Sequence, residues 1–134
     1  GEFMKSFNVK DGLICKHLQA AGINIGIVTG RSSDIVAKRA KELGIDIVYQ
    51  GQKDKKKTLS LICDHLKVNH HEIAYIGDDL NDLEIIEQIG LSACPSDAVK
   101  KIRDSVAYIC EKAGGQGAFR EFADAILRAR GTSA

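Results

Sequence analysis

The sequence is poor in several residue types that would otherwise single out a class of protein. Its 134 residues include no tryptophan, one proline and one methionine, and aromatic residues make up only 5% of the chain. No apolar run approaches the ~20 residues of a membrane-spanning helix, and no signal-peptide pattern opens the chain. The formal net charge is only +1, so no strong field favours nucleic acid or an anionic membrane. These absences predict a cytoplasmic protein that binds neither nucleic acid nor membranes.

Cysteine and histidine are not arranged as a zinc site. None of the four cysteines forms a C-x-x-C pair, and the adjacent His70 and His71 have no third ligand nearby in sequence. Cys15 and Cys63 lie among apolar residues of expected helices. This pattern indicates small buried side chains in a reducing compartment.

The residues that are present have the balance of a soluble globular protein. Hydrophobic residues make up 44% and charged residues 28%, and the length suits one domain over residues 1–134. Short apolar runs alternate with longer amphipathic segments. The expected strands span residues 23–29, 45–50, 72–76, 91–94 and 106–110; the expected helices span residues 34–43, 80–88, 96–104 and 118–128, with one more that Asp54 caps. Residues 3–9 resemble an isolated strand, and Asp11 is expected to cap a helix that runs through residue 20.

Alternating strands and helices predict a Rossmann-like α/β fold, in which a mainly parallel sheet lies between two layers of helices. In such folds ligands bind beyond the carboxyl ends of the strands. Polar residues gather at three of those ends: Thr29-Gly30-Arg31, Gln50-Gly51-Gln52 and Gly77-Asp78-Asp79. Glycine and aspartate there could simply form turns. A threonine, a lysine cluster and three carboxylates are more than turns require.

Asp78, Asp79 and Asp82 form the pattern G-D-D-x-x-D after an apolar run. Carboxylates held this close repel one another, so a cation is expected to neutralise them. Oxygen ligands without nearby cysteine or histidine favour Mg²⁺ over zinc. The alternative is that Asp79 caps the following helix and Asp82 complements its dipole.

Thr29 ends a strand and is followed by a glycine turn. The Thr29 hydroxyl and the backbone N–H groups of the turn suit a phosphate oxygen. A lysine run, Lys53, Lys55, Lys56 and Lys57, lies at a strand-to-helix junction. Most of these lysines are expected to be solvated, and one at the helix start could point over the strand ends. A metal, a hydroxyl and a cation together indicate phosphoryl transfer.

Six segments, in this order along the chain, carry a resemblance to a known family. They are Phe7-Asn8-Val9-Lys10-Asp11-Gly12, Ile27-Val28-Thr29-Gly30-Arg31, Tyr49-Gln50-Gly51, Lys53-Asp54-Lys55, Ala74-Tyr75-Ile76-Gly77-Asp78-Asp79-Leu80-Asn81-Asp82 and Gly114-Gly115-Gln116-Gly117-Ala118-Phe119-Arg120-Glu121. The ordered set resembles the haloacid dehalogenase (HAD) superfamily. Within it, the set resembles the small, cap-less phosphatases of the 3-deoxy-D-manno-octulosonate 8-phosphate (KDO 8-phosphate) type, which serve lipopolysaccharide precursor synthesis.

The resemblance implies a role for each site residue. Thr29 and Lys55 would be catalytic, and Asp78 would be the principal Mg²⁺ ligand, supported by Asp79 and Asp82. The residues that would bind the phosphate or the sugar acid are Asn8, Asp11, Gly30, Arg31 and Arg120. Members of the group are usually tetramers, so a homo-oligomer is expected.

The sequence departs from the family in one respect. The family opens with a strand that ends in Asp-x-Asp-Gly-x-x-Thr, whose first aspartate is the nucleophile, and these 134 residues contain no such motif. The chain alone is therefore expected to be inactive. The strands near residues 23–28, 47–49 and 73–76 are expected to be neighbours or to be separated only by a gap. Because a central gap would leave costly unpaired N–H and C=O groups, either rearranged pairing or a strand borrowed from another chain is expected. A truncated chain, a shortened homologue and a non-catalytic binding or assembly module are all consistent with this departure. The phosphatase-like domain of a CMP-sialate synthetase, or a 9-carbon ulosonate 9-phosphate phosphatase, is the alternative within the family.

Overall fold

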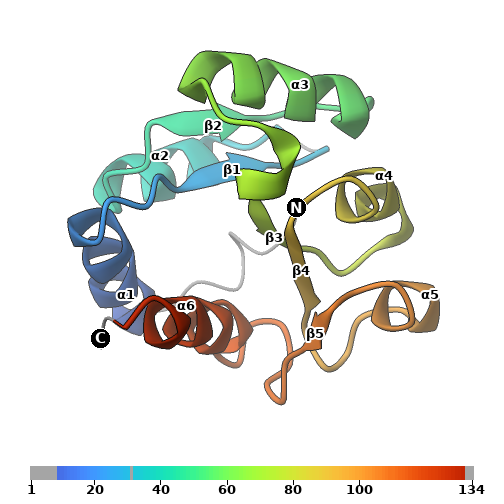
Figure 1. Cartoon of the computed structure of the whole chain (residues 1–134). Helices are drawn as coiled ribbons and strands as arrows, with labels where there is room; N and C mark the ends of the chain where they lie inside the picture. The colour runs from blue at the N-terminus through green and yellow to red at the C-terminus, as the bar shows by residue number, and fades with distance from the viewer. Residues whose placement is uncertain (1–8, 31, 132–134) are drawn as a thin grey trace.

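The computed structural model describes residues 9–30 and 32–131, which alternate between helices and strands (Figure 1). The helices are α1 (Val9–Ala20), α2 (Asp34–Glu42), α3 (Lys55–Leu66), α4 (Leu83–Ile86), α5 (Lys100–Arg103) and α6 (Ala118–Ala129). The strands are β1 (Gly26–Val28), β2 (Ile47–Tyr49), β3 (Ala74–Ile76), β4 (Leu91–Cys94) and β5 (Tyr108–Ile109). Two short 3₁₀ helices, η2 (His70–Glu72) and η3 (Leu80–Asp82), flank β3.

The strands form two parallel sheets. β1 pairs with β2, with Ile27 opposite Val48, and β3, β4 and β5 form a separate sheet in that order, with Ile76 opposite Ala93. All the strand pairs among the described residues are parallel, which confirms the predicted α/β class. β1 and β3 belong to different sheets, so a gap separates them. The described strands show no rearranged pairing across that gap, and a strand borrowed from another chain stays a prediction.

Helices bury apolar side chains on both faces of the strands. On one face α1 packs on α6, where Ile14 and Leu18 contact Ala123 and Leu127 in one buried cluster. On the other face Leu59 of α3 packs with Ile85 of α4. Phe119, near the start of α6, packs against three of the buried clusters and so links the two sheets to α1.

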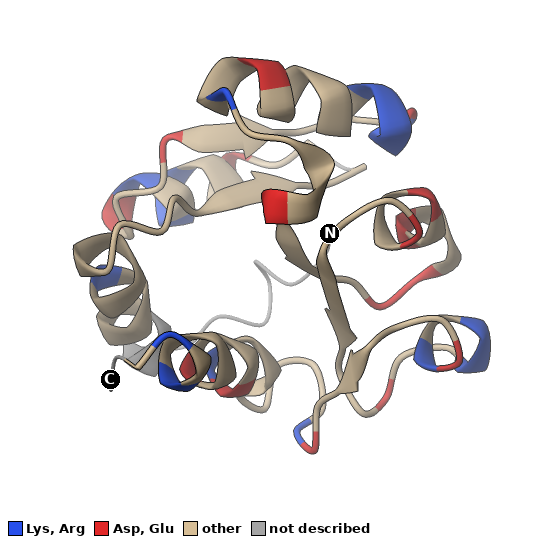
Figure 2. Cartoon of the chain, viewed as in Figure 1, with Lys and Arg blue, Asp and Glu red and all other residues tan. Residues whose placement is uncertain are grey.

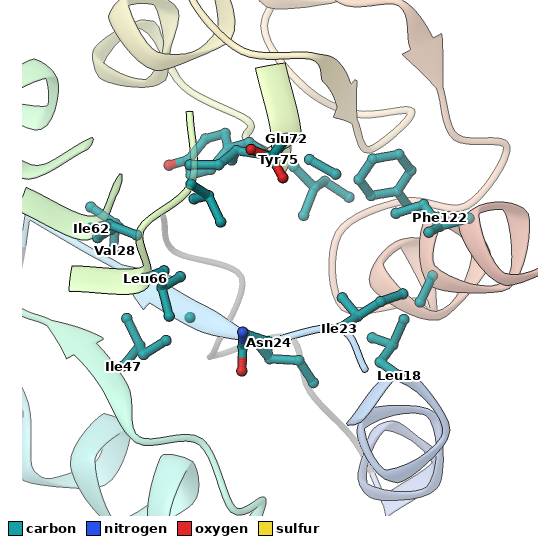
Figure 3. A pocket seen from close by; sticks show the side chains of 18 of the residues that line it. Leu18, Ile23, Asn24, Val28, Ile47, Ile62, Leu66, Glu72, Tyr75 and Phe122 are labelled. Atoms are coloured by element: carbon teal, nitrogen blue, oxygen red, sulfur yellow. The ribbon is translucent and has the colours of Figure 1, made fainter. Parts of the chain in front are cut away.

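A cavity of about 400 Å³ separates the two sheets (Figure 3). Its walls come from β1, β3, α3 and α6, and its lining includes Val28, Ile76, Ile62 and Phe122. Because both faces of the sheets carry helices, the cavity lies within the layer that the sheets occupy. We call this cavity the inter-sheet slot.

Capping explains several helix starts. Ser33 caps α2 by accepting the Ile35 N–H at 3.2 Å, and Asp54 caps α3 by accepting the Lys57 N–H at 3.0 Å, both as predicted. Gly44 follows α2 with a φ of +72°, a conformation that favours glycine.

The structure corrects four expected elements. Asp11 lies inside α1 and does not cap it, because the helix begins at Val9. Val9, the last residue of the expected 3–9 strand, is helical as well, and the rest of that strand lies outside the described residues. The helix expected over residues 80–88 is the 3₁₀ turn η3 followed by the short α4, and the one expected over 96–104 is only α5.

Candidate active site

The candidate site lies where β1, β2 and β3 end, and Lys55 is at its centre. Lys55 is the first residue of α3, and its side chain is only 3% exposed. Its ammonium donates to Asp82 Oδ1 at 2.6 Å and to Asn81 Oδ1 at 3.4 Å. Lys53, Lys56 and Lys57 are exposed, so Lys55 alone of the run points inward, as the position of the helix start predicted. In Figure 2 the basic first turn of α3 lies across from the acidic segment that leads into α4.

Asp82 holds Lys55 in place and is itself 1% exposed. Besides Lys55, its carboxylate accepts the Tyr75 hydroxyl at 2.5 Å and the backbone N–H groups of Asp78 and Asp79 at 3.0 and 3.2 Å. Burial by itself would raise the pKa of Asp82, but nearby positive charge that includes Lys55, and hydrogen bonds from Lys55 and Tyr75, keep that pKa below its usual value. Burial and the Asp82 charge raise the pKa of Tyr75 well above its usual value. Asp82 is therefore a carboxylate at neutral pH and forms an ion pair with Lys55.

The turn between β3 and η3 depends on Gly77. A Cβ placed at Gly77 would come within 2.7 Å of the Asp82 side chain. A glycine is therefore needed for the Asp82 carboxylate to fold back under the backbone of residues 78 and 79.

Thr29 and Gly30 lie at the same edge as Lys55. The Thr29 N–H donates to the Tyr49 carbonyl at 3.0 Å, and the Thr29 carbonyl accepts the Gln52 N–H at 3.0 Å. Gln52 links this edge to α3, because its side-chain oxygen accepts the Thr58 hydroxyl at 2.8 Å. Gly30 is near η3, since a Cβ built there would lie 3.9 Å from Asn81 Nδ2.

These contacts join the ends of the three strands. Thr29 reaches α3 through Gln52, and Lys55 reaches the turn at Asp78 through Asp82. Lys55 and Asp78 thus share Asp82 as a partner, while Thr29 is linked to α3 through Gln52. That the three residues surround one pocket stays a prediction. Their catalytic and metal-binding roles stay predictions.

Of the three aspartates, Asp79 and Asp82 form caps, and Asp78 remains as a candidate metal ligand. Asp79 is exposed and caps η3 by accepting the Leu80 N–H at 2.7 Å, and Asp82 completes the capping box. Their predicted support of a metal stays a prediction, and these contacts favour the capping alternative. Within the described ranges, no group of three or more histidine, cysteine, aspartate or glutamate side chains could hold a metal ion. Mg²⁺ commonly takes only one or two protein carboxylates and completes its shell with water and phosphate oxygens, so half-buried Asp78 fits as a single ligand.

Arg120 makes no contact with this edge among the residues that the structure describes, and the binding residues predicted besides Gly30 cannot be placed there. Arg120 lies in the first turn of α6, and its Nε is 3.7 Å from Asp124 Oδ2 on the same helix. Asn8 and Arg31 lie outside the described residues, and Asp11 is described only by its backbone within α1.

Sequence reasoning missed two residues that shape the site. Tyr75 lies in an apolar strand, where its hydroxyl gave no sign of a buried carboxylate partner. Asn81 lies inside the G-D-D-x-x-D pattern at one of its unspecified positions, so the pattern itself could have suggested it.

Comparisons with known proteins place the chain in a family. Residues 9–90 match the family model of the haloacid dehalogenase-like hydrolases. The chain is 38% identical over 131 residues to the 3-deoxy-D-manno-octulosonate 8-phosphate phosphatase of Escherichia coli (strain K12), covering 98% of this chain and 70% of that protein. The enzyme of the same name from Yersinia pestis is 39% identical over 130 residues, at 97% and 70% coverage.

Solved structures agree with this placement. The cobalt-bound phosphatase of this name from Haemophilus influenzae superimposes with a TM-score of 0.90 at 36% identity, covering 93% of this chain and 73% of that one. The enzyme from Moraxella catarrhalis, solved with magnesium, phosphate and KDO, gives a TM-score of 0.88 at 42% identity, with 92% and 71% coverage.

The chain thus belongs to the haloacid dehalogenase-like hydrolases. The branch of that family to which its relatives belong consists of phosphomonoester hydrolases. Its relatives are the KDO 8-phosphate phosphatases, which confirms the group that the motifs predicted. None of the helices in the described ranges is long and apolar enough to cross a membrane.

Proposed function

We propose that this domain hydrolyses the phosphate ester of a sugar acid, most simply KDO 8-phosphate, with Mg²⁺ as cofactor. The observation that supports the proposal is the buried ammonium of Lys55, held at 2.6 Å by Asp82 beside the ends of β1 and β3. The relatives named above act on this substrate, and one of them binds magnesium, phosphate and KDO.

Each residue would have a separate task. An ammonium has three N–H donors, and among the described residues Asp82 and Asn81 take two of those of Lys55, which leaves one for a phosphate oxygen. The Thr29 hydroxyl and the Gly30 N–H would bind other phosphate oxygens, and Asp78 would hold the metal ion. Bound Mg²⁺ would neutralise phosphate charge. Asp82 acts through Lys55 and is a positioning residue.

The nucleophile is expected on a segment outside these 134 residues. Their sequence contains no Asp-x-Asp motif, and the covalent route of the family needs an aspartate that accepts the phosphoryl group. We therefore propose that the 134-residue chain has negligible phosphatase activity, and that a longer chain with an Asp-x-Asp strand is active.

The test compares the two forms. Phosphate release is measured from KDO 8-phosphate and from a 9-carbon ulosonate 9-phosphate, with Mg²⁺ and with EDTA. We expect turnover only for the extended form with Mg²⁺, and faster with KDO 8-phosphate. Turnover by the 134-residue chain at an ordinary enzymatic rate would show that its nucleophile is already present.

We also propose that the protein forms a homo-oligomer in the cytoplasm. The support is the usual tetrameric state that the family resemblance implies. Light scattering at micromolar concentration is the check, and a monomer would count against the proposal.

A further inference from the structure

The segment between β2 and α3, Gln50-Gly51-Gln52, is hydrogen-bonded to the turn that follows β1. The Gln50 side-chain oxygen accepts the Ser33 N–H at 2.7 Å, and the Gln52 N–H donates to the Thr29 carbonyl at 3.0 Å. The two contacts lie at residues 29 and 33, so they hold the turn after β1 at both of its ends. We call Gln50-Gly51-Gln52 the glutamine segment.

The glutamine segment also lies directly against this turn. Gly51 has a φ of +66°, a conformation that favours glycine, and a Cβ built on it would lie 3.0 Å from the Ser32 hydroxyl oxygen. A side chain at residue 51 would therefore push the two segments apart. The glycine permits the close approach that the two hydrogen bonds require.

Gln52 connects the glutamine segment to the helix that carries Lys55. Its side-chain N–H donates to the Gln50 carbonyl at 2.8 Å, and its side-chain oxygen accepts the hydroxyl of Thr58, which is buried. Thr58 lies three residues after Lys55 in α3, almost one helical turn further along. The same short segment thus contacts the turn after β1 and the first turns of α3.

We propose that Gln50 is a positioning residue, which holds the turn after β1 in place relative to Lys55 and so determines how tightly the site binds a phosphate group. The inference rests on the proposed function, in which Thr29 and Gly30 bind phosphate oxygens beside Lys55. Gln50 acts through the Ser33 backbone and not by contact with the substrate. A displacement of ~1 Å in a binding group can cost on the order of 10² in rate, and hydrogen bonds from supporting side chains supply the required precision.

The first experiment tests whether Gln50 holds the turn in solution. Gln50→Met keeps the length of the side chain and removes the oxygen that accepts the Ser33 N–H. In the 134-residue chain, amide hydrogen exchange at Ser33 should be at least threefold faster in this variant than in the parent. Gln50→Asn, which is polar but one methylene too short to reach Ser33, should behave in the same way and serves as the second variant if Gln50→Met does not fold.

The matched control is Gln19→Met. The Gln19 side chain donates to the Gly44 carbonyl at 3.0 Å, just after the opposite end of α2, and Gln19 is exposed. This variant therefore loses one neutral hydrogen bond next to the same helix, away from the turn after β1. Exchange at Ser33 should be the same as in the parent.

The second experiment measures function in the extended form that carries the Asp-x-Asp strand, with Mg²⁺. Substrate and product both bind through phosphate, so Gln50→Met should raise KM for KDO 8-phosphate and the inhibition constant of inorganic phosphate together, each at least fivefold. kcat/KM should fall at least tenfold. Gln19→Met should keep all three constants within twofold of the parent. Calorimetric titration with inorganic phosphate gives the same comparison of affinities without turnover.

Each contrary result has a distinct meaning. Unchanged exchange at Ser33 would show that Gln50 does not hold the turn, and parental KM and phosphate affinity in Gln50→Met would show that the contact is only structural; either result overturns the proposal. Equal losses in Gln50→Met and Gln19→Met would also overturn it, because both would then act through the stability of α2. If the extended parent binds phosphate but hydrolyses no sugar-acid phosphate, the proposed function fails, and the calorimetric affinities alone decide the role of Gln50. A parent that binds no phosphate would overturn both.

Discussion

Lys55 and Asp82 connect the stability of the domain to its chemistry at the scale of single residues. Their side chains are 3% and 1% exposed, so each charge is tolerable only because of the other. Tyr75 and two backbone N–H groups complete the carboxylate shell. A buried pair of this kind fixes the position of a cation more firmly than an exposed pair such as Lys100 with Asp104 could.

Loss of the Asp82 carboxylate should destabilise the fold strongly. Asp82→Ala leaves the Lys55 ammonium buried without its partner, which is expected to lower the free energy of unfolding by about 3–5 kcal/mol. Asp79→Ala removes an exposed cap of the same turn and is expected to cost about 1 kcal/mol. Urea unfolding of the two variants provides the comparison. Equal losses would mean that the Lys55–Asp82 pair contributes no more than a cap.

The same pair predicts a loss of stability in acid. The pKa of Asp82 is lower in the folded protein than in the unfolded chain, so its contribution is fully present above the unfolded pKa of about 3.9 and is lost as the pH falls through the folded pKa. Asp82→Asn should therefore be less stable than the parent near neutral pH, and the difference should shrink in acid. Urea unfolding of both proteins at a series of pH values tests this. A difference that is constant down to the lowest pH would contradict it.

At the scale of elements, helices hold the two sheets together. Among the described strands no ladder joins β1 to β3. The two sheets are instead connected by the packing of α1 on α6 and of α3 on α4.

Close backbone approach at Gly90 sets the position of β3 against the turn before β4. A Cβ at Gly90 would lie 2.0 Å from the His71 carbonyl oxygen, and backbone cannot move aside as a side chain can. Gly90→Ala should thus destabilise the fold by more than the ~1–3 kcal/mol typical of backbone strain alone, and so lower the melting temperature markedly. Gly22→Ala is the matched control, because Gly22 has a φ of +81° and open space around it. Equal melting temperatures for the two variants would mean that the backbone near Gly90 and His71 shifts at little cost.

The sequence was informative about elements and less so about contacts between them. β4 has the bounds that its short apolar run predicted, and Ser33 and Asp54 cap as their positions before amphipathic segments indicated. β1 is shorter than its apolar run, because an apolar run indicates which residues are buried and not which ones pair. The residues just before Gly26 line the slot and do not pair with β2. Local patterns could not show that the Tyr75 hydroxyl and Lys55 would meet at Asp82, since that depends on how η3 turns back under β3.

At the scale of the whole molecule, the chain is two parallel half-sheets that share helices. β1 and β2 carry Thr29 and lead into Lys55, while β3 carries the turn of Asp78 to Asp82. The Lys55–Asp82 contact is therefore a bond between the two halves as well as part of the site. Both halves must be in place before the phosphate-binding groups converge.

Activity should depend on this convergence in a form of the protein that carries the Asp-x-Asp strand. There, Lys55→Ala should lower kcat/KM by on the order of 10² or more, because a preorganised cation at a developing negative charge is lost. Lys56→Ala, which removes the next lysine along the same helix, should leave kcat/KM within about twofold, because Lys56 is exposed. Since Lys55→Ala also leaves Asp82 without its cation, circular dichroism must first show that the variant is folded at the assay temperature. A folded Lys55→Ala variant with parental kcat/KM would remove Lys55 from the site, and equal losses in both variants would mean that the run of lysines acts only through its total charge.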